Sequence, residues 1–330
     1  MPAETPSVLH RVGAAAAGIG RLGAGRPRMK LAIELAVVAL VVAFLGVFLA
    51  TQWSALPDYD WRFEPGWLAV SAIAVAGFYM ASAQVWLGLV AALGEQLDGT
   101  AGRAIYGKSL VARYVPTSAL ALVGRVVLAE REGVSKRVTL ASVAYELGCS
   151  LTAAVAVGSY FVVTLPALEG SPARWAILAV VPLALAGLHP RIFRPLADRA
   201  LRMLGREPLP AALPFGKVLL FVLLISLLWS TIGFGLYAFA AALHPLDLAD
   251  LPFVAASYAV GFCVAVLTFI VPAGLGSRDA ALAAGLDVVV PGNVAIAIAV
   301  AFRIFQTSVE LLWVGAVTWH ARRRSRAQRS

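Results

Sequence analysis

The chain has 330 residues, of which 60% are hydrophobic and 14% are charged, and it carries a formal net charge of +9. Soluble globular domains are roughly half apolar and a quarter charged, so this composition excludes them and indicates an integral membrane protein. We expect an all-α polytopic membrane helix bundle of about seven to eight spans, because a helix satisfies its own backbone hydrogen bonds in lipid.

A basic arm precedes the first apolar run, and that run is too long to be the core of a cleavable signal peptide. We expect the arm to occupy residues 1–30, a single transmembrane domain 31–319, and a basic tail 320–330. No polar segment is long enough to predict a soluble domain. A spanning helix needs about 20 apolar residues. The apolar runs that could span lie at 31–52, 67–94, 138–165, 174–188, 217–243, 252–271 and 291–319.

Two short stretches interrupt this pattern in the same way, at 114–125 (YVPTSALALVGR) and 270–279 (IVPAGLGSRD). Each has a Val-Pro pair, then small residues, then an arginine, and a long apolar helix follows. Proline and glycine break helices, and non-helical backbone at membrane depth persists only where protein or water covers it. Paired interruptions in the two halves of a membrane protein point to a substrate site. The residues expected to interrupt the helices are Pro116, Pro272, Gly274 and Gly276.

Basic residues concentrate in the N-terminal arm, in the connections at 95–137 and 190–217, and in the C-terminal tail. The positive-inside rule then predicts a multi-pass protein of the inner (cytoplasmic) membrane with both termini in the cytoplasm. For all the charges to agree with this rule, the piece at 101–131 should dip in and out from the cytoplasmic face. The piece at 275–289 is expected to provide an eighth crossing, as a short helix or a pair of half-elements, and the alternative that it is re-entrant stays open.

Three ionisable residues, Glu146, Arg303 and Glu310, lie deep in apolar helices. A charge at the centre of a span costs about 2.5–3.5 kcal/mol on insertion scales, so each should face the bundle interior and have a partner. We expect Glu146 to pair with Arg303, and Glu310 to meet Arg125 or Arg278. A substrate-binding role and a buried pair that only fixes helix packing both remain open.

No motif predicts a catalytic residue, a metal site or a cofactor. The histidines lie in the tails or at span ends, and the sequence has no HExxH, Walker or GxSxG pattern. Arg125 and Arg278 follow the interruptions, where a guanidinium and free helix amides are suited to bind phosphate. The predicted substrate-binding residues are Arg125, Glu146, Arg278, Asp279, Arg303 and Glu310.

Four features together resemble a known family: the pattern at Tyr114–Arg125, the Gly-Val stretch ending in Lys136-Arg137, the run Pro272–Asp279, and the Arg303 helix. The chain resembles the flippase-like family, also called the lysylphosphatidylglycerol synthase transmembrane-domain family, over most of its length. In larger members this region precedes a soluble aminoacyl-transferase domain, for which this sequence has no counterpart. The resemblance therefore implies lipid translocation or an accessory role in envelope lipid or glycan assembly, and not lipid synthesis.

The leading hypothesis is a lipid translocase that moves a polar or anionic lipid between leaflets. The chain has no ATP site, so uphill transport would need ion coupling or a partner. One alternative is a membrane-embedded transferase acting on a polyprenyl-linked substrate, with Asp279 or Glu146 as its carboxylate. Another is a non-catalytic subunit that holds a lipid or glycan synthase. The expected partners are membrane lipids and such a synthase, and not nucleic acid, because a basic tail beside a span more often touches anionic lipid.

Overall fold

The computed structural model describes residues 59, 61–112, 119–165, 168–203, 208, 212–267 and 277–327. These residues form helices and their connections, and no strand occurs among them, which confirms the all-α class. The expected span at 31–52 lies outside the described residues. So do the basic arm, Pro116, Pro272, Gly274 and Gly276.

Long helices occupy five of the other six expected spans, and the run at 174–188 forms shorter helices. Five helices are long and apolar enough to cross a membrane, and a bent pair of helices adds a sixth candidate. The five are α3 (Pro65–Ala92), α6 (Lys136–Thr164), α10 (Phe215–Leu243), α11 (Leu251–Leu267, with the short helix η2 at Leu248–Asp250 before it) and α13 (Gly292–Ala327). Large apolar side chains on them remain exposed, as at Leu223 (58%) and Leu312 (75%). Exposed apolar surface of this kind fits helices that face lipid.

The first interrupted segment is a re-entrant hairpin made of α4 (Gly99–Ala112) and α5 (Ala119–Arg131). Its two ends meet, because the backbone N–H of Ser135 donates to Glu95 Oε2 at 2.7 Å. Gly133 has a φ of 90°, which ends α5 in a turn that other residues rarely adopt. Ser135 then caps α6 by accepting from the Val138 N–H at 3.3 Å. Helices α4 and α5 pack against each other as the dip at 101–131 requires, and entry from the cytoplasmic face stays a prediction.

The second interrupted segment is also a hairpin, formed by α11 and α12 (Ser277–Leu286). The two helices run antiparallel, since Gly261 lies against Arg278 and Gly285 lies against Ser257. Of the two forms left open for 275–289, a crossing or a re-entrant element, the antiparallel packing of α12 on α11 favours the re-entrant one. The ten residues of α12 are about 15 Å long, half the thickness of the hydrocarbon core. A hairpin returns the chain to the face from which it entered. It therefore leaves the basic C-terminal tail on the same side of the membrane as two crossings would, in agreement with the positive-inside rule.

The run at 174–188 forms two short helices, α7 (Pro172–Leu178) and α8 (Val180–Gly187). The chain then turns by 74° into α9 (Pro190–Met203). Arginines at 191, 194, 199 and 202 lie on one side of α9. Phe193 on the other side packs on Tyr145 of α6, with ring centroids 4.3 Å apart. Helix α9 thus has the charge segregation of a helix that lies along a membrane surface.

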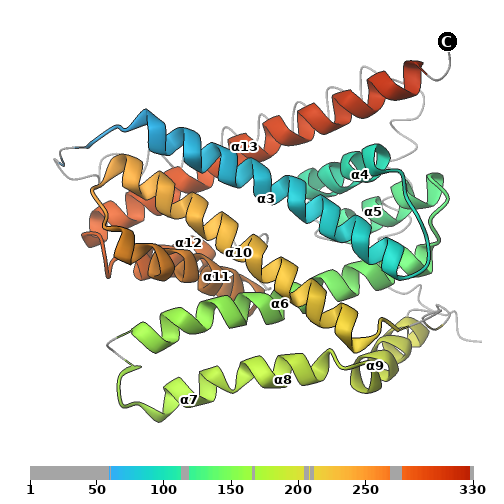
Figure 1. Ribbon diagram of the computed structural model, residues 1–330, viewed down its shortest axis with the longest axis horizontal. Helices are drawn as coiled ribbons and strands as arrows, with labels where there is room; N and C mark the ends of the chain where they lie inside the picture. The colour runs from blue at the N-terminus through green and yellow to red at the C-terminus, as the bar shows by residue number, and fades with distance from the viewer. Residues whose placement is uncertain are drawn as a thin grey trace, which may run out of the picture.

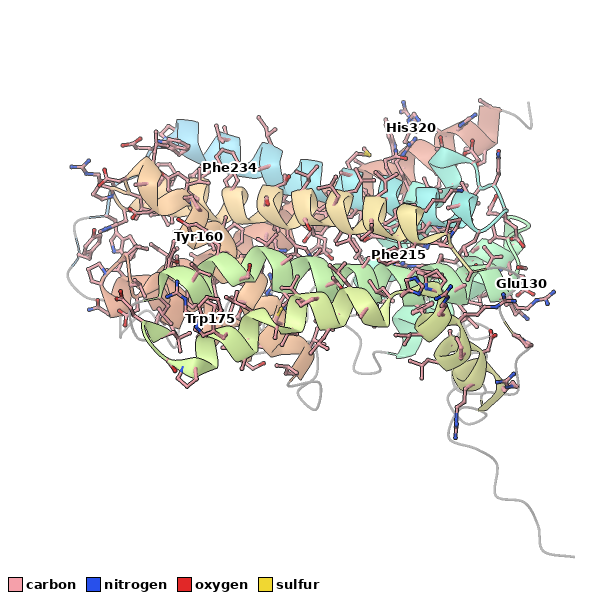
Figure 2. The ribbon with its side chains drawn as sticks, turned by 60° about the horizontal axis from the view of Figure 1, so that its bottom comes forward. Glu130, Tyr160, Trp175, Phe215, Phe234 and His320 are labelled. Atoms are coloured by element: carbon pink, nitrogen blue, oxygen red, sulfur yellow. The ribbon has the colours of Figure 1, made fainter. Side chains whose placement is uncertain are left out.

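Helices α3, α10 and α13 cross the centre of the bundle (Figure 1). Close approach of α10 and α11 depends on Gly233, where an added Cβ would lie 2.6 Å from the Cα of Ala255. Figure 2 shows Glu130, Phe215 and His320 toward one end of the molecule, and Tyr160 and Trp175 toward the other. The α4–α5 hairpin enters from the first end and the α11–α12 hairpin from the opposite end (Figure 1).

Candidate functional site

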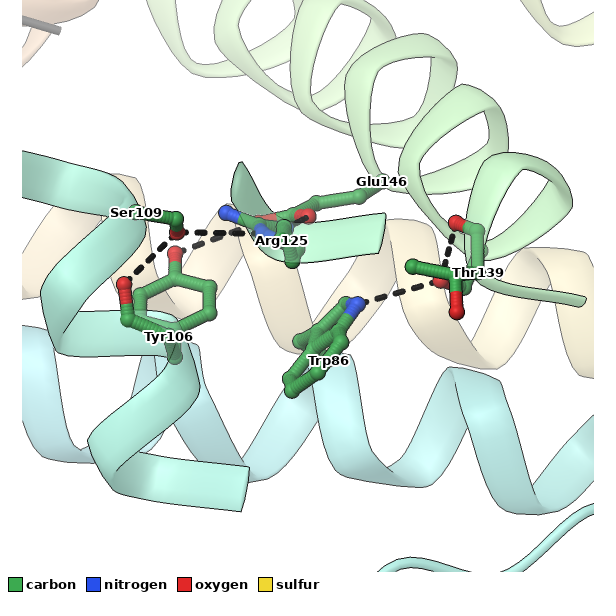
Figure 3. A network of polar contacts seen from close by, with 7 residues as sticks. Trp86, Tyr106, Ser109, Arg125, Thr139 and Glu146 are labelled. Atoms are coloured by element: carbon green, nitrogen blue, oxygen red, sulfur yellow. Dashed lines mark hydrogen bonds and ion pairs between the residues drawn. The ribbon is translucent and has the colours of Figure 1, made fainter. Parts of the chain in front are cut away.

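One polar centre surrounds Arg125, which α5 places between α3, α4 and α6 (Figure 3). The guanidinium forms an ion pair with Glu146 of α6 and donates through Nε to the Ser109 hydroxyl at 3.1 Å. Tyr106 of α4 donates its hydroxyl to the other Glu146 oxygen at 3.1 Å. The side chains of Arg125 and Glu146 are only 11% and 21% exposed. We call these residues, with Trp86, the Arg125 centre.

Two aromatic rings complete the Arg125 centre. The Arg125 guanidinium carbon lies 4.6 Å from the ring centroid of Tyr106 and 5.2 Å from that of Trp86. The fully buried Trp86 is itself fixed, because its indole N–H donates to the Ser142 hydroxyl at 3.0 Å (Figure 3). Stacking on aromatic faces favours arginine over lysine at such a position. The centre is therefore built to hold a planar cation away from bulk water.

A second polar centre runs from α12 through α13 to α3. Arg278 donates to Gln306 Oε1 at 3.4 Å, and Gln306 Nε2 donates to the Tyr79 hydroxyl at 3.0 Å. Tyr79 in turn donates to Glu310 Oε2 at 2.7 Å. Tyr258 of α11 also donates to Gln306 Oε1, at 3.0 Å, and its ring lies 4.6 Å from the Arg278 guanidinium. We call these five residues the Gln306 relay, because they connect a cation to the fully buried Glu310.

Asp279 and Arg303 lie beside the relay. The Asp279 carboxylate of α12 is 3.9 Å from Arg303 Nη1 of α13, and both side chains are 15% exposed. Two charges in partial burial at this distance attract one another more strongly than they would in water. Three of the six predicted site residues, Arg278, Asp279 and Arg303, thus lie where α12 packs against α13, and Glu310 is connected to them through Gln306 and Tyr79.

The predicted pairing of Glu146 with Arg303 is wrong. Glu146 pairs with Arg125, and Arg303 pairs with Asp279. Arg125 was one of the two arginines expected beside Glu310. Its ion pair with Glu146 places it in the Arg125 centre, whereas Glu310 belongs to the Gln306 relay. Short turns cause this arrangement, since each places a hairpin directly against the long helix that follows it. The charge after each interruption therefore meets the charge in the next helix of its own unit.

The sequence reasoning missed the neutral members of both centres, namely Tyr79, Trp86, Tyr106, Ser109, Tyr258 and Gln306. Gln306 carried a usable signal, because an amide in an apolar helix is costly to bury without partners. It also lies three residues after Arg303 and four before Glu310, a spacing that places all three on one helix face. The tyrosines carried no comparable signal, since most buried tyrosines serve packing.

The two centres share helix α3. Tyr79 and Trp86 are seven residues apart, so they lie on one face of α3 and about 10 Å apart along its axis. Each centre receives its cation from a different hairpin. Arg125 comes from the hairpin at one end of the bundle, and Arg278 comes from the hairpin at the other end. Among the described residues, no group of three His, Cys, Asp or Glu side chains could hold a metal ion.

In the described residues, these features define an all-helical, multi-pass membrane protein with two helical hairpins and charged centres inside the bundle. The chain belongs to the family described as lysylphosphatidylglycerol synthase TM region, whose model matches residues 31–313. No curated protein and no solved structure matches the chain. Family membership confirms the resemblance seen in the sequence and associates this membrane protein with lipid-related function.

Proposed function

We propose that this protein is a lipid translocase that moves a polar or anionic lipid between the leaflets of the cytoplasmic membrane. One observation carries the proposal: hairpins from opposite ends of the bundle bring Arg125 and Arg278 to two centres about 10 Å apart along one face of α3. Broken elements that meet inside a bundle are typical of transporter substrate sites. A head group that passes between the leaflets would meet one centre and then the other.

Each centre offers a cation that a lipid phosphate can engage. A phosphate would compete with the Glu146 carboxylate for Arg125, and with the neutral Gln306 oxygen for Arg278. The arginine faces already rest on aromatic rings, which holds them for planar, two-point recognition. Glu146, Asp279 and Glu310 would balance the arginines in the absence of substrate or receive a cationic head group.

The transferase alternative has less support. Asp279 and Glu146, the two carboxylates considered as its catalytic group, are each held by an arginine. The paired arginine lies against an oxygen that a catalytic carboxylate would have to present to its substrate. The accessory-subunit alternative predicts that both centres serve packing alone, and the following experiment separates it from transport.

The test is lipid translocation by the purified chain in liposomes, read from the leaflet exposure of fluorescently labelled anionic lipid. Arg278→Lys keeps the charge and loses the planar fork, so transport should fall while thermal stability persists. Arg278→Ala should lower transport further. Gln84→Ala, on the exposed side of α3, is the control and should leave transport unchanged. Full transport by well-folded Arg278→Ala would remove Arg278 from the site. Poor folding of both variants, with normal transport by the folded fraction, would support packing.

A further inference from the structure

A cavity of about 510 Å³ lies apart from both polar centres, between α4, the end of α5 and the last turns of α13. Figure 1 shows these three segments together at the end of the bundle where the chain finishes. Helix α13 has 36 residues and is about 54 Å long, whereas the hydrocarbon core is about 30 Å thick. Its last turns therefore extend past the hydrocarbon, and the cavity lies at the membrane surface.

Four cationic side chains line the cavity, against two carboxylates. The cations are Lys108, Arg131, Arg322 and Arg324, and the carboxylates are Asp98 and Glu132. Lys108 lies ten residues beyond Asp98, so it is about 15 Å deeper along α4 than the arginines at the rim. The positive charge thus extends from the rim of the cavity inward.

The rim is held in place by a contact between two helices. Asp98 accepts from the backbone N–H groups of Thr100 and Ala101, at 2.9 and 3.0 Å, which caps α4. Arg324 of α13 lies 3.2 Å from Asp98 Oδ2 and donates to the Thr100 hydroxyl at 2.8 Å. Asp98 is therefore satisfied, while Arg131 and Arg322 form no ion pair among the described residues. These two arginines remain available for an anion.

Part of the cavity lining is apolar. Ala104 and Ile105 of α4, Leu128 of α5 and Ala321 of α13 lie between the charged positions, beside the hydroxyls of Thr318 and Ser325. A free phosphate would gain nothing from the apolar side chains, whereas a lipid carries a phosphate joined to apolar chains. Lipid pockets beside membrane helices combine these two kinds of lining. The chemistry therefore favours an amphiphilic phosphodiester over a soluble anion.

We propose that this cavity, which we call the surface cavity, binds the phosphate of an anionic glycerophospholipid through Arg131 and Arg322, with Lys108 at its inner end. The inference deepens the proposed function, on which it rests, by naming an anionic substrate class and a place where the head group first binds. Because the two centres and the surface cavity share none of these residues, binding can be measured separately from transport.

The experiment titrates the purified full chain in detergent with dihexanoyl phosphatidylglycerol, and with dihexanoyl phosphatidylcholine, glycerol 1-phosphate and inorganic phosphate as comparisons. Arg131→Gln and Arg322→Gln should each weaken phosphatidylglycerol binding about tenfold, as expected for loss of one charge-assisted bond. Arg326→Gln is the matched control, because Arg326 is an exposed arginine of the same helix that does not line the surface cavity. It should change binding less than twofold.

A photoreactive phosphatidylglycerol should also crosslink to peptides of α4 and the end of α13. Equal weakening in all three variants, equal affinity for phosphatidylcholine, or no binding would overturn the proposal. Equal affinity for glycerol 1-phosphate or inorganic phosphate would reassign the surface cavity to a soluble anion and overturn the lipid assignment. Binding without transport in liposomes would count against translocation and keep the surface cavity. Transport without phosphatidylglycerol binding would overturn the surface cavity and keep the proposed translocation.

Discussion

The Arg125 guanidinium contacts one carboxylate, one hydroxyl and two aromatic rings inside the bundle. Its partner Glu146 likewise uses both oxygens, one for Arg125 and one for Tyr106. Removing one member of such a pair leaves a charge with no compensation, which costs more than the pair itself contributes. The pairing is therefore measurable as a coupling between two specific positions.

A double-mutant cycle tests the partner assignment. We expect Arg125→Ala and Glu146→Ala each to destabilise the protein, and their coupling to be about 1 kcal/mol or more, as for residues in direct contact. Glu146→Ala combined with Arg303→Ala should be additive within about 0.5 kcal/mol, because those side chains belong to different pairs. Unfolding in mixed micelles measures both cycles. Strong coupling of Glu146 with Arg303 would contradict the structure.

His244 makes stability depend on pH at the opposite end of the bundle from the surface cavity. Partial burial lowers the pKa of His244 below its ordinary value of 6.5, and nearby Arg62 adds to the effect. The Tyr59 hydroxyl is hydrogen-bonded to His244 Nδ1. A depressed pKa means that the unfolded chain binds the proton more readily. The stabilisation is therefore present above pH 6.5 and is lost as the pH falls through the native pKa.

We expect the melting temperature of the wild type to fall as the pH drops from 8 to 5, and to fall less in His244→Gln. His320→Gln is the control, because His320 lies exposed at the far end of α13. A matched fall in wild type and His244→Gln would show that another group is responsible.

At the residue scale, the sequence identified all the charged members of both centres but not their partners. Hydropathy marks a charge in an apolar run without reference to the fold. Which charged residues pair with each other depends on which helices a short turn brings together. That arrangement depends on the two hairpins, and the sequence did not determine how deeply they enter the bundle. The tyrosines were missed because a tyrosine has no clear preference between core packing and polar contact.

Helix packing in this bundle depends on small residues at particular crossings. Gly233 of α10 faces Ala255 of α11, and an added Cβ would lie 2.6–2.8 Å from three Ala255 atoms. Without a strong hydrophobic driving force between helices in lipid, such close backbone contact is a main source of helix association. The α10–α11 crossing also supports the hairpin that carries Arg278.

We expect Gly233→Ala to destabilise the protein by about 1–3 kcal/mol, the usual cost of overpacking. Gly315→Ala is the matched control, since Gly315 is also a helical glycine but has no atom within 4 Å of an added Cβ. It should be neutral or stabilising by up to about 1 kcal/mol, because alanine favours helix. Thermal denaturation of the two variants in detergent compares them directly. A Gly233→Ala protein as stable as Gly315→Ala would show that the crossing is not tight.

At the element scale, apolar run length predicted where each of the five long helices begins to within two residues, because the bilayer fixes the length that a helix needs. It did not predict that α13 continues to Ala327, or whether the short α12 crosses the membrane. It also gave no indication of α9, whose direction depends on the 74° turn after α8. Neighbouring protein covers the polar groups of re-entrant and surface helices. The hydropathy of such a helix therefore does not determine its position in the membrane.

For the whole molecule, the structure places the two hairpins in opposite orientation. The α4–α5 hairpin joins α3 to α6 at the end where α13 finishes, and the α11–α12 hairpin joins α10 to α13 at the other end (Figure 1). In each unit a hairpin charge pairs with a charge in the next long helix, Arg125 with Glu146 and Asp279 with Arg303. If the protein is the translocase proposed above, this opposite orientation would give each face of the membrane its own hairpin beside the substrate path.

This arrangement predicts labelling from opposite sides of the membrane. Glu132 and Asp287 are exposed and lie in the turns that follow the first and second hairpins. In a background with Cys149 and Cys263 replaced by alanine, Glu132→Cys should react with an impermeant maleimide only in inside-out vesicles. Asp287→Cys should react only in right-side-out cells, because the basic connections mark the first end as cytoplasmic. The cysteine-free parent, which should not react, is the control. Labelling of both cysteines from one side would refute the opposed hairpins and the orientation that the charges predict.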